Sequence, residues 1–183
     1  MVYKGFGEKE RNNNSKNKIL AEKLISEALK FHIHGNIQEA SKYYQTFLNK
    51  GFSDPRVYSN YGIIFQLSGQ LEKAIELYKK SIELYPSSPE AYANLGNILK
   101  AQSKLDEAKE LQKKAISLKP DFAEAYNNLG GVYHDLKELD LAEENTRKAI
   151  EIKQNFSDAY NNLGSILYLK KNYEEAEKVT RKA

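Results

Sequence analysis

Apolar residues recur along this chain with the spacing of helix faces, in blocks of constant length. From Ala21 onward, each block of 34 residues holds two stretches in which apolar residues stand three or four positions apart, as on one face of an α-helix. In the first stretch they mostly occupy the fourth, seventh, eighth and eleventh places of the block. The pattern predicts five pairs of helices, the last pair incomplete, in blocks 21–54, 55–88, 89–122, 123–156 and 157–183.

Two places in every block hold small residues. The eighth place is alanine or glycine in all five blocks, and the twentieth place is alanine in all five. Small side chains allow two helices to pack at the short end of the usual separation of about 8–10 Å, so we expect the two helices of each block to form a tight hairpin. These residues are Ala28, Gly62, Gly96, Gly130 and Gly164 at the eighth place, and Ala40, Ala74, Ala108, Ala142 and Ala176 at the twentieth.

Several helix starts are marked by residues that cap the first turn. Asp54 and Ser88 each precede a proline, which combines a capping side chain with the residue that best fits the first helical position. In the next two blocks an Asp or Asn is followed three residues later by an acid, which is the arrangement of a capping box. These expected boxes are Asp121 with Glu124 and Asn155 with Asp158.

The order of residues within a block resembles the tetratricopeptide repeat. The matching features are an aromatic residue at the fourth place, Leu-Gly at the seventh and eighth, alanine at the twentieth, and Pro86 or Pro120 after the second helix. The resemblance extends from Ala21 to the end of the chain. It implies an all-α fold, a right-handed α-solenoid of five helix-turn-helix repeats with the last incomplete. It also implies a role in binding a protein or peptide.

Asparagine stands at the sixth place of four blocks, although it is a poor helix former. At 100° per residue, the sixth place lies opposite the apolar places on the helix. We therefore expect these side chains to point into the concave groove of the solenoid, where each amide offers one acceptor and two donors to a peptide backbone. The row, Asn60, Asn94, Asn128 and Asn162, resembles the asparagine ladder of the O-GlcNAc transferases.

A second interpretation is that these amides bond to the neighbouring helix or to water and bind no ligand. Other residues expected to line the groove are Asn97, Asn127, Asn161, Lys100, His134 and Tyr168. Members of the family that bind the carboxylate tails of chaperones need basic residues at the second place, among others. Here the second places read Arg56, Glu90, Glu124 and Asp158, so we do not expect a chaperone-tail receptor.

The net charge of +3 comes from the first 20 residues. They hold five basic and two acidic side chains, whereas residues 21–183 hold 23 of each sign. A neutral body creates no field that attracts phosphates, so we expect no nucleic-acid partner. The leader, residues 1–20, is expected to be basic, polar and partly disordered. No apolar run could span a membrane and no secretory signal opens the chain, which predicts a cytoplasmic protein with no membrane partner.

The sequence contains none of the short motifs of common enzymes and cofactor sites. It has no cysteine, no phosphate-binding glycine loop, no zinc-protease histidine pair and no serine-hydrolase elbow. His32 and His34 are two residues apart, so on a helix they point away from each other and do not suit a shared metal ion. We expect no catalytic residue, no cofactor and no metal in this chain.

The last block stops at its twenty-seventh place, inside the second helix. Terminal repeats normally carry a polar cap, so we expect Tyr173, Ala176 and Val179 to be partly uncovered. Self-association through this end of the array is a further prediction.

Two functions fit these features. The first is a non-catalytic scaffold that binds an extended peptide in its concave groove. The second is the substrate-recruiting N-terminal region of a larger glycosyl-, sulfo- or methyltransferase. The leader sequence KGFGEK is similar to the start of some cyanobacterial tetratricopeptide proteins in which such a domain commonly follows the repeats.

Overall fold

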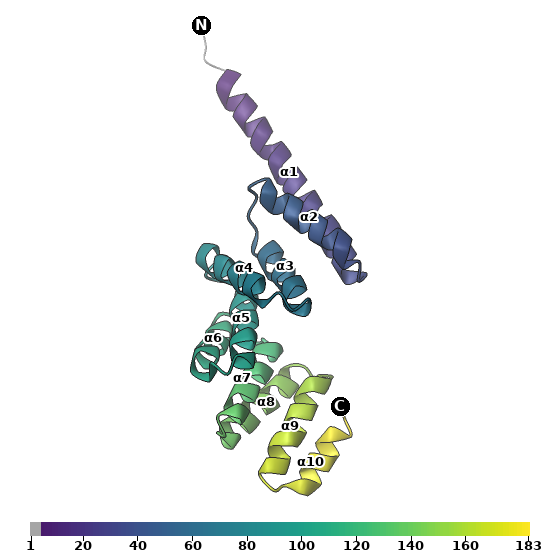
Figure 1. Cartoon of the computed structure of the whole chain (residues 1–183), viewed down its shortest axis with the longest axis vertical. Coiled ribbons are helices and arrows are strands. Elements are labelled where there is room, and N and C mark those ends of the chain that lie inside the picture. The colour runs from purple at the N-terminus through teal and green to yellow at the C-terminus, as the bar shows by residue number, and fades with distance from the viewer. Residues whose placement is uncertain (1–4) are drawn as a thin grey trace.

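The computed structural model describes residues 5–183, with side chains from residue 14 onward. Within this part of the chain there are ten α-helices and no strands (Figure 1). The helices are α1 (Gly5–Ile33), α2 (Ile37–Asn49), α3 (Pro55–Leu67), α4 (Leu71–Leu84), α5 (Pro89–Ala101), α6 (Leu105–Leu118), α7 (Ala123–Asp135), α8 (Leu139–Ile152), α9 (Ser157–Leu169) and α10 (Tyr173–Thr180).

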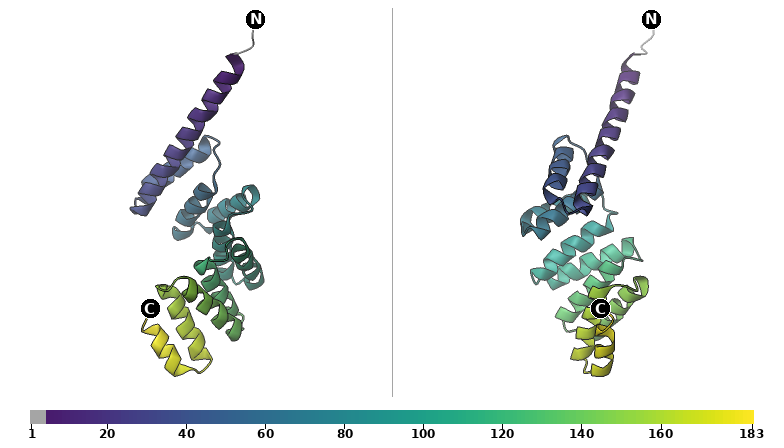
Figure 2. Two further views of the ribbon diagram at one scale, coloured as in Figure 1. Left: turned by 180° about the vertical axis from the view of Figure 1, so that it is seen from behind. Right: turned by 90° about the vertical axis from the view of Figure 1, so that its right-hand side faces the viewer.

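Consecutive helices form hairpins that stack into an elongated array. Each hairpin consists of a first helix (α1, α3, α5, α7 or α9) and the second helix that follows it, and each packs against the next hairpin (Figures 1 and 2). From α3 onward, every first helix begins at the first place of a 34-residue block. The expectation of an all-α helical-repeat solenoid is therefore confirmed.

The first helix is longer than the block pattern predicts. α1 spans 29 residues and begins at Gly5, so it includes residues 5–20 of the expected leader and extends beyond the stack (Figure 1). After Gly7 the leader contains no glycine or proline, so no residue breaks the helix before the repeats begin. The leader is thus continuous with the first repeat. Residues 1–4 lie outside the described part.

The two helices of each hairpin meet where the eighth-place residue faces the second helix. A methyl group on Gly62 would lie 2.5 Å from the Tyr78 ring, and one on Gly130 would lie 2.3 Å from Thr146 Oγ1. Real Cβ atoms do not approach other atoms so closely, so only glycine fits at these two positions without rearrangement. The twentieth-place alanines are buried in all five hairpins. The predicted role of the small residues in close helix packing is confirmed.

Of the four predicted side-chain caps, only that of Asp54 forms. Ser88 does stand at the capping position of α5, before Pro89, but its side chain makes no capping bond. Asp54 Oδ1 accepts a hydrogen bond from the Arg56 N–H at 2.8 Å, but α7 and α9 begin after Phe122 and Phe156, which occupy the capping positions and make no side-chain capping bond. The expected boxes beginning at Asp121 and Asn155 therefore do not form. Both phenylalanines pack against the apolar surface between hairpins, and this packing moves the helix starts one residue later.

The predicted exposure at the end of the array is correct for only one of three residues. Tyr173 is 56% exposed, whereas Ala176 and Val179 are buried at 7% and 8%. These two side chains pack against Leu163 and Leu167 of α9. The short α10 is long enough to complete the core of its own hairpin, which the block pattern did not indicate.

A network of ion pairs joins the last two hairpins. Glu143 of α8 contacts Arg147 at 2.8 Å and Lys170, which follows α9, at 2.7 Å. Lys170 also contacts Asp140, and Arg147 also contacts Glu175 of α10. Partial burial raises the pKa of Glu143, but the hydrogen bonds and charges of Lys170 and Arg147 outweigh this effect and hold the pKa below its ordinary value.

Two adjacent glycines in α7 allow a matched test of hairpin packing. We expect Gly130→Ala to destabilise the protein by about 1–2 kcal/mol, because the new methyl group overlaps Thr146 and the Ala142 carbonyl oxygen. Gly131→Ala should be neutral or stabilising by up to about 1 kcal/mol, because it gains helix propensity and meets only the tip of Lys100. Thermal unfolding followed by circular dichroism measures both. Equal effects of the two substitutions would contradict the packing described here.

The Glu143 network should make stability depend on pH. Because the pKa of Glu143 is lower in the folded state, its ionised form stabilises the fold above the unfolded pKa of about 4.3, and this contribution is lost as the pH falls through the folded pKa. Glu143→Gln should lower the free energy of unfolding at pH 7 by about 1 kcal/mol or less, since the partners are partly exposed. It should also reduce the loss of melting temperature between pH 6 and pH 3.

Glu144 supplies the control, because it is exposed on the same helix and forms no ion pair with any side chain from residue 14 onward. Glu144→Gln should leave the pH dependence unchanged. A Glu143→Gln protein that loses stability in acid as steeply as the parent would disprove the assignment.

Candidate functional site

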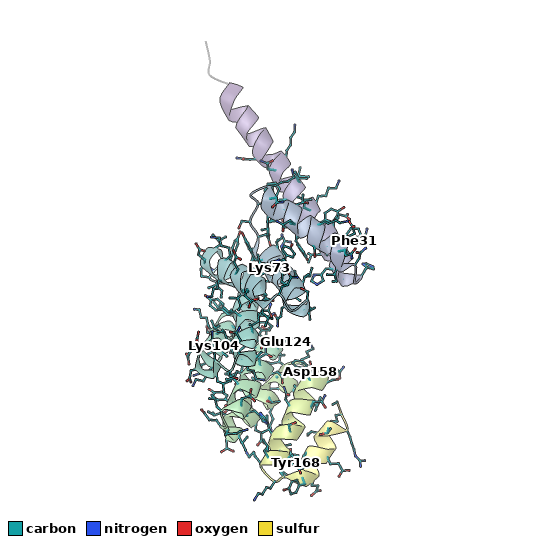
Figure 3. The ribbon with its side chains drawn as sticks, viewed as in Figure 1. Phe31, Lys73, Lys104, Glu124, Asp158 and Tyr168 are labelled. Atoms are coloured by element: carbon teal, nitrogen blue, oxygen red, sulfur yellow. The ribbon has the colours of Figure 1, made fainter. Side chains whose placement is uncertain are left out.

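The first helices of four hairpins share a hollow on one side of the array. This hollow, which we call the asparagine cavity, has a volume of about 480 Å³ and is lined from α3, α5, α7 and α9 and from the loops before α7 and α9. Figure 3 shows two of its residues, Glu124 and Asp158, on the same side of the stack. The asparagines that line it are Asn60, Asn94, Asn97, Asn127 and Asn128.

The structure brings three of the four sixth-place asparagines into this cavity, but they are not equivalent. Asn60 Nδ2 donates to the Arg56 carbonyl oxygen in its own helix at 2.8 Å. Asn94 and Asn128 line the cavity without a side-chain hydrogen bond to any residue from 14 onward. Asn162 does not line the cavity, and its Nδ2 donates to Asn127 Oδ1 at 2.9 Å. Two amides therefore keep their full hydrogen-bonding capacity.

Two of the other expected groove residues take part in packing between helices. Asn127 is 7% exposed and accepts the bond from Asn162, which joins α7 to α9. Asn97 Oδ1 accepts a hydrogen bond from Gln112 Nε2 at 3.3 Å, and the same nitrogen donates to the Ala93 carbonyl oxygen at 2.9 Å. The amides of Asn97 and Asn127 thus bond to neighbouring helices, as in the second interpretation given above, although both residues still border the cavity.

Lys100 and His134 converge on a single carboxylate. Lys100 Nζ lies 3.5 Å from Asp135 Oδ2, and His134 Nδ1 lies 3.2 Å from Asp135 Oδ1. The three side chains connect α5 with α7. Because Lys100 is paired, its charge is largely balanced within the protein.

The remaining expected residues lie in a different hollow near the C-terminus. His134, Asn161 and Tyr168 line a cavity of about 980 Å³ between α7, α9 and α10. Tyr168 is 64% exposed and packs against Tyr173 in an edge-to-face arrangement, with ring centroids 5.2 Å apart. The expected site residues are thus divided between two cavities.

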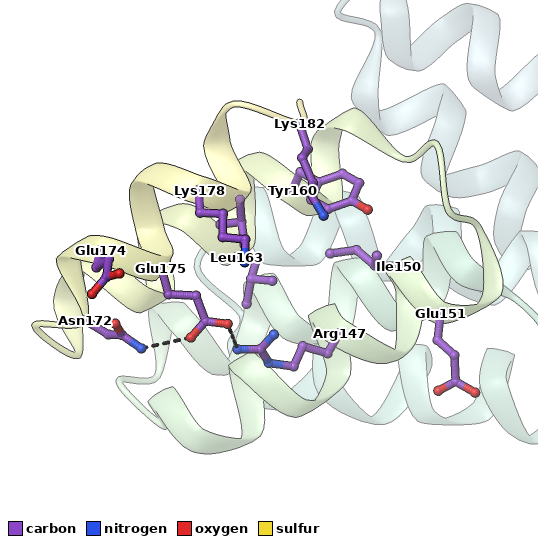
Figure 4. A pocket seen from close by; sticks show the side chains of 11 residues that line it. Arg147, Ile150, Glu151, Tyr160, Leu163, Asn172, Glu174, Glu175, Lys178 and Lys182 are labelled. Carbon is purple, nitrogen blue, oxygen red and sulfur yellow. Dashed lines mark hydrogen bonds and ion pairs between the residues drawn. The ribbon is translucent and has the colours of Figure 1, made fainter.

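A further cavity of about 760 Å³ lies on α8, α9 and α10 and contains none of the expected residues (Figure 4). Its wall includes the pair of Arg147 with Glu175, and Asn172 donates to the same Glu175 side chain. These carboxylate contacts anchor α10 to α8. The polar groups of Arg147, Asn172 and Glu175 at the border of this cavity therefore already bond to one another.

The asparagine cavity carries a net negative charge. Among residues 14–183, its walls include Glu90, Glu124 and Asp158 but only one basic side chain, Lys153. Lys153 contacts Glu124 at 2.8 Å. Partial burial raises the pKa of Glu124, but the hydrogen bond and charge of Lys153 outweigh this effect and lower it. Glu124 is therefore ionised at neutral pH, and the cavity disfavours anionic ligands such as phosphate groups.

Sequence reasoning missed three residues of this cavity, which come from the loops between hairpins. They are Phe122, Phe156 and Lys153. Lys153 Nζ lies 4.5 Å from the centroid of the Phe156 ring, and Lys119 lies 4.8 Å from that of Phe122. The repeat period could have identified these residues, because the two phenylalanines stand 34 residues apart and so do the two lysines.

Two further properties concern the part of the chain that the structure describes. No group of three or more His, Asp or Glu side chains there is arranged to hold a metal ion. None of the helices in that part combines the length and the apolar character needed to cross a membrane.

The two kinds of asparagine should differ in their effect on stability. Replacing both Asn94 and Asn128 by alanine should leave the melting temperature unchanged or slightly raised, since alanine is the better helix former by about 0.5 kcal/mol per residue. Asn127→Ala should cost about 1 kcal/mol, because it removes the partner of Asn162. Thermal unfolding of the three proteins measures this. A large loss in the double variant would show that Asn94 and Asn128 support the fold.

The chain is similar to known repeat proteins over most of its length. Family models described as "TPR repeat" match residues 62–103 and 96–137, and one described as "Tetratricopeptide repeat" matches residues 121–183. A crystal structure of MamA is 30% identical and covers 85% of this chain and 91% of its own, with a TM-score of 0.68. PilF of Pseudomonas aeruginosa is 21% identical and covers 90% and 75%, with a TM-score of 0.78. No curated protein matches significantly.

Proposed function

The chain belongs to the tetratricopeptide-repeat family, and from that premise we propose that it binds an extended peptide segment of another protein in the asparagine cavity. Members of this family generally act as protein-interaction scaffolds. The observation that carries the proposal is that Asn94 and Asn128 line one cavity on neighbouring helices with no side-chain hydrogen bond to the part of the protein whose side chains are described.

The spacing of these two amides suits a main chain. Packed helices lie about 10 Å apart, and an extended chain advances about 3.3 Å per residue, so Asn94 and Asn128 would contact peptide units about three residues apart. Each amide can accept from a peptide N–H and donate to a peptide C=O. Binding of this kind recognises the backbone and depends little on the sequence of the ligand.

The charge of the cavity narrows the class of ligand. Glu90 and Asp158 are exposed at its edge and form no ion pair with a described side chain. A peptide without acidic residues in the bound stretch avoids repulsion from these carboxylates. The same charges disfavour nucleic acid, whose affinity depends on basic side chains.

The scaffold function is the one that the comparisons favour, because the matching family models describe repeats only. They do not favour a substrate-recruiting region of a transferase. A cytoplasmic location, and self-association through the last hairpin, stay predictions.

Peptide selection tests the proposal directly. We expect a phage library of random 12-residue peptides to yield binders to the full chain, and the selected peptides, labelled with fluorescein, to bind the Asn94→Ala/Asn128→Ala variant about tenfold more weakly in anisotropy titrations. The reason is that each amide hydrogen bond contributes about 0.5–1.5 kcal/mol. N-methylation of the central peptide units should weaken binding of the parent protein by a similar factor.

Asn145→Ala is the matched control, because this asparagine lies on α8, outside the cavity lining. Its side chain donates to the Leu141 carbonyl oxygen and bonds to no other residue from 14 onward. It should bind the selected peptides like the parent. Unchanged affinity in the double variant would refute the proposed role of Asn94 and Asn128.

A further inference from the structure

The junction between the second and third hairpins departs from the pattern of the next two. At three places of the block, buried serines stand where the following junctions hold larger or less polar side chains. The fifth, twenty-seventh and thirty-fourth places read Ser59, Ser81 and Ser88 at this junction, then Ala93, Ala115 and Phe122, then Asn127, Ala149 and Phe156. We call the three residues the serine junction.

A cavity of about 700 Å³ lies at the serine junction, within the usual range of about 300–1,000 Å³ for ligand pockets. Its lining includes Pro55, Leu84, Ser59 and Ser88. Two repeats further along the chain, Phe156 stands at the place of Ser88 and packs in a cluster with Ala123 and Ile152. Ala123 and Ile152 occupy the same places of their block as Pro55 and Leu84. The cavity is thus where the ring of a phenylalanine at position 88 would pack.

The walls of this cavity suit an aromatic ring. Tyr85 stands at the place of Lys119 and Lys153, the two residues that pack over Phe122 and Phe156. Its hydroxyl donates to Ser53 Oγ at 2.8 Å, and this bond holds the ring at the side of the cavity. Prolines and a leucine supply the remaining apolar surface.

Two hydroxyl groups of the serine junction have no hydrogen-bond partner among the side chains and backbone that the structure describes. Ser59 is 7% exposed and Ser81 is fully buried, and neither Oγ bonds to any residue from 14 onward. Buried polar groups normally find a partner, and Ser59 belongs to the lining of the cavity. Both oxygens are buried, so a ligand in the cavity would contact its apolar walls and not these hydroxyls.

We propose that the cavity at the serine junction binds an aromatic side chain of the peptide held in the asparagine cavity, and that this side chain takes the place that Phe122 and Phe156 occupy at the next junctions. The inference rests on the proposed function. Ser59, Asn60 and Glu90 line both cavities, so one bound peptide can reach both. The asparagines hold its main chain, and the serine junction selects for phenylalanine or tyrosine.

The phenylalanines at the next two junctions suggest a substitution that should block the cavity. Ser88→Phe restores the pattern of the next two junctions and should fill the cavity with the protein's own ring, without lowering the melting temperature. Ser88→Ala removes the same hydroxyl but adds no ring, so it is the matched control. Three libraries of 12-residue peptides displayed on phage serve as probes: one without aromatic residues, one with a fixed central phenylalanine and one with a fixed central tyrosine.

We expect the two aromatic libraries to yield the tighter binders to the parent protein. Ser88→Ala leaves the cavity open, so it should still bind the aromatic peptide more tightly than its alanine counterpart. Replacing the aromatic residue of a selected peptide by alanine should weaken binding at least tenfold, as for a side chain buried in an interface pocket. Ser88→Phe should bind the aromatic peptide and its alanine counterpart equally and weakly. Binders from the aromatic-free library with the same affinity would overturn this inference and leave the proposed function intact, whereas no binder from any library would overturn both.

A second measurement needs no substitution in the protein. The methyl groups of Leu84 line the cavity, so an aromatic ring bound there should shift their NMR signals through its ring current. The shift should occur with the phenylalanine peptide and be absent with its alanine counterpart. Equal spectra with the two peptides would refute the inference even if Ser88→Phe failed to fold.

Discussion

The close contact between the two helices of each hairpin is the constraint on which the rest of the structure depends. Glycine at the eighth place lets the second helix approach until its own twenty-fourth-place side chain, such as Tyr78 or Thr146, touches the glycine backbone. This contact fixes the rotation of the first helix. Once the rotation is fixed, the sixth place must face away from the hairpin core. The same geometry recurs in each repeat because the eighth place is always small, Ala28 in the first hairpin and glycine in the others.

Identical residues at identical places nevertheless perform different tasks along the array. Asn162 bonds across to Asn127, while the amides of Asn94 and Asn128 bond to no residue from 14 onward. For Asn128 the difference lies in the fifth place of the neighbouring first helix, which is Asn127 beside α9 but Ala93 beside α7. An alanine offers no hydrogen-bond partner, so the amide beside it remains available. A ladder defined by sequence alone therefore overstates the number of residues free to bind a ligand.

The loops between hairpins decide how much of each junction is filled. Where the thirty-fourth place is phenylalanine, the ring packs between hairpins and a lysine lies over it. Where it is Ser88, the same space is a cavity. A cavity formed in this way sits beside the asparagines because the loop leads directly into a first helix. Variation at a single place of the repeat can thus replace a packed side chain by a cavity.

The sequence by itself determined the helices, their pairing and the face on which the asparagines lie, because all three follow from a 34-residue period and from local steric limits at places such as Gly130 and Ala142. Local rules also predicted the Asp54 cap. They failed at Asp121 and Asn155, because the burial of Phe122 and Phe156 between hairpins outweighs the preference of a capping side chain.

Only the tertiary structure decided which amides remain free, that His134 and Tyr168 belong to a separate cavity, and where a cavity opens beside Ser88. These properties depend on contacts between neighbouring repeats, and such contacts are set by pairs of side chains far apart in the sequence, which a periodic pattern within one repeat does not encode.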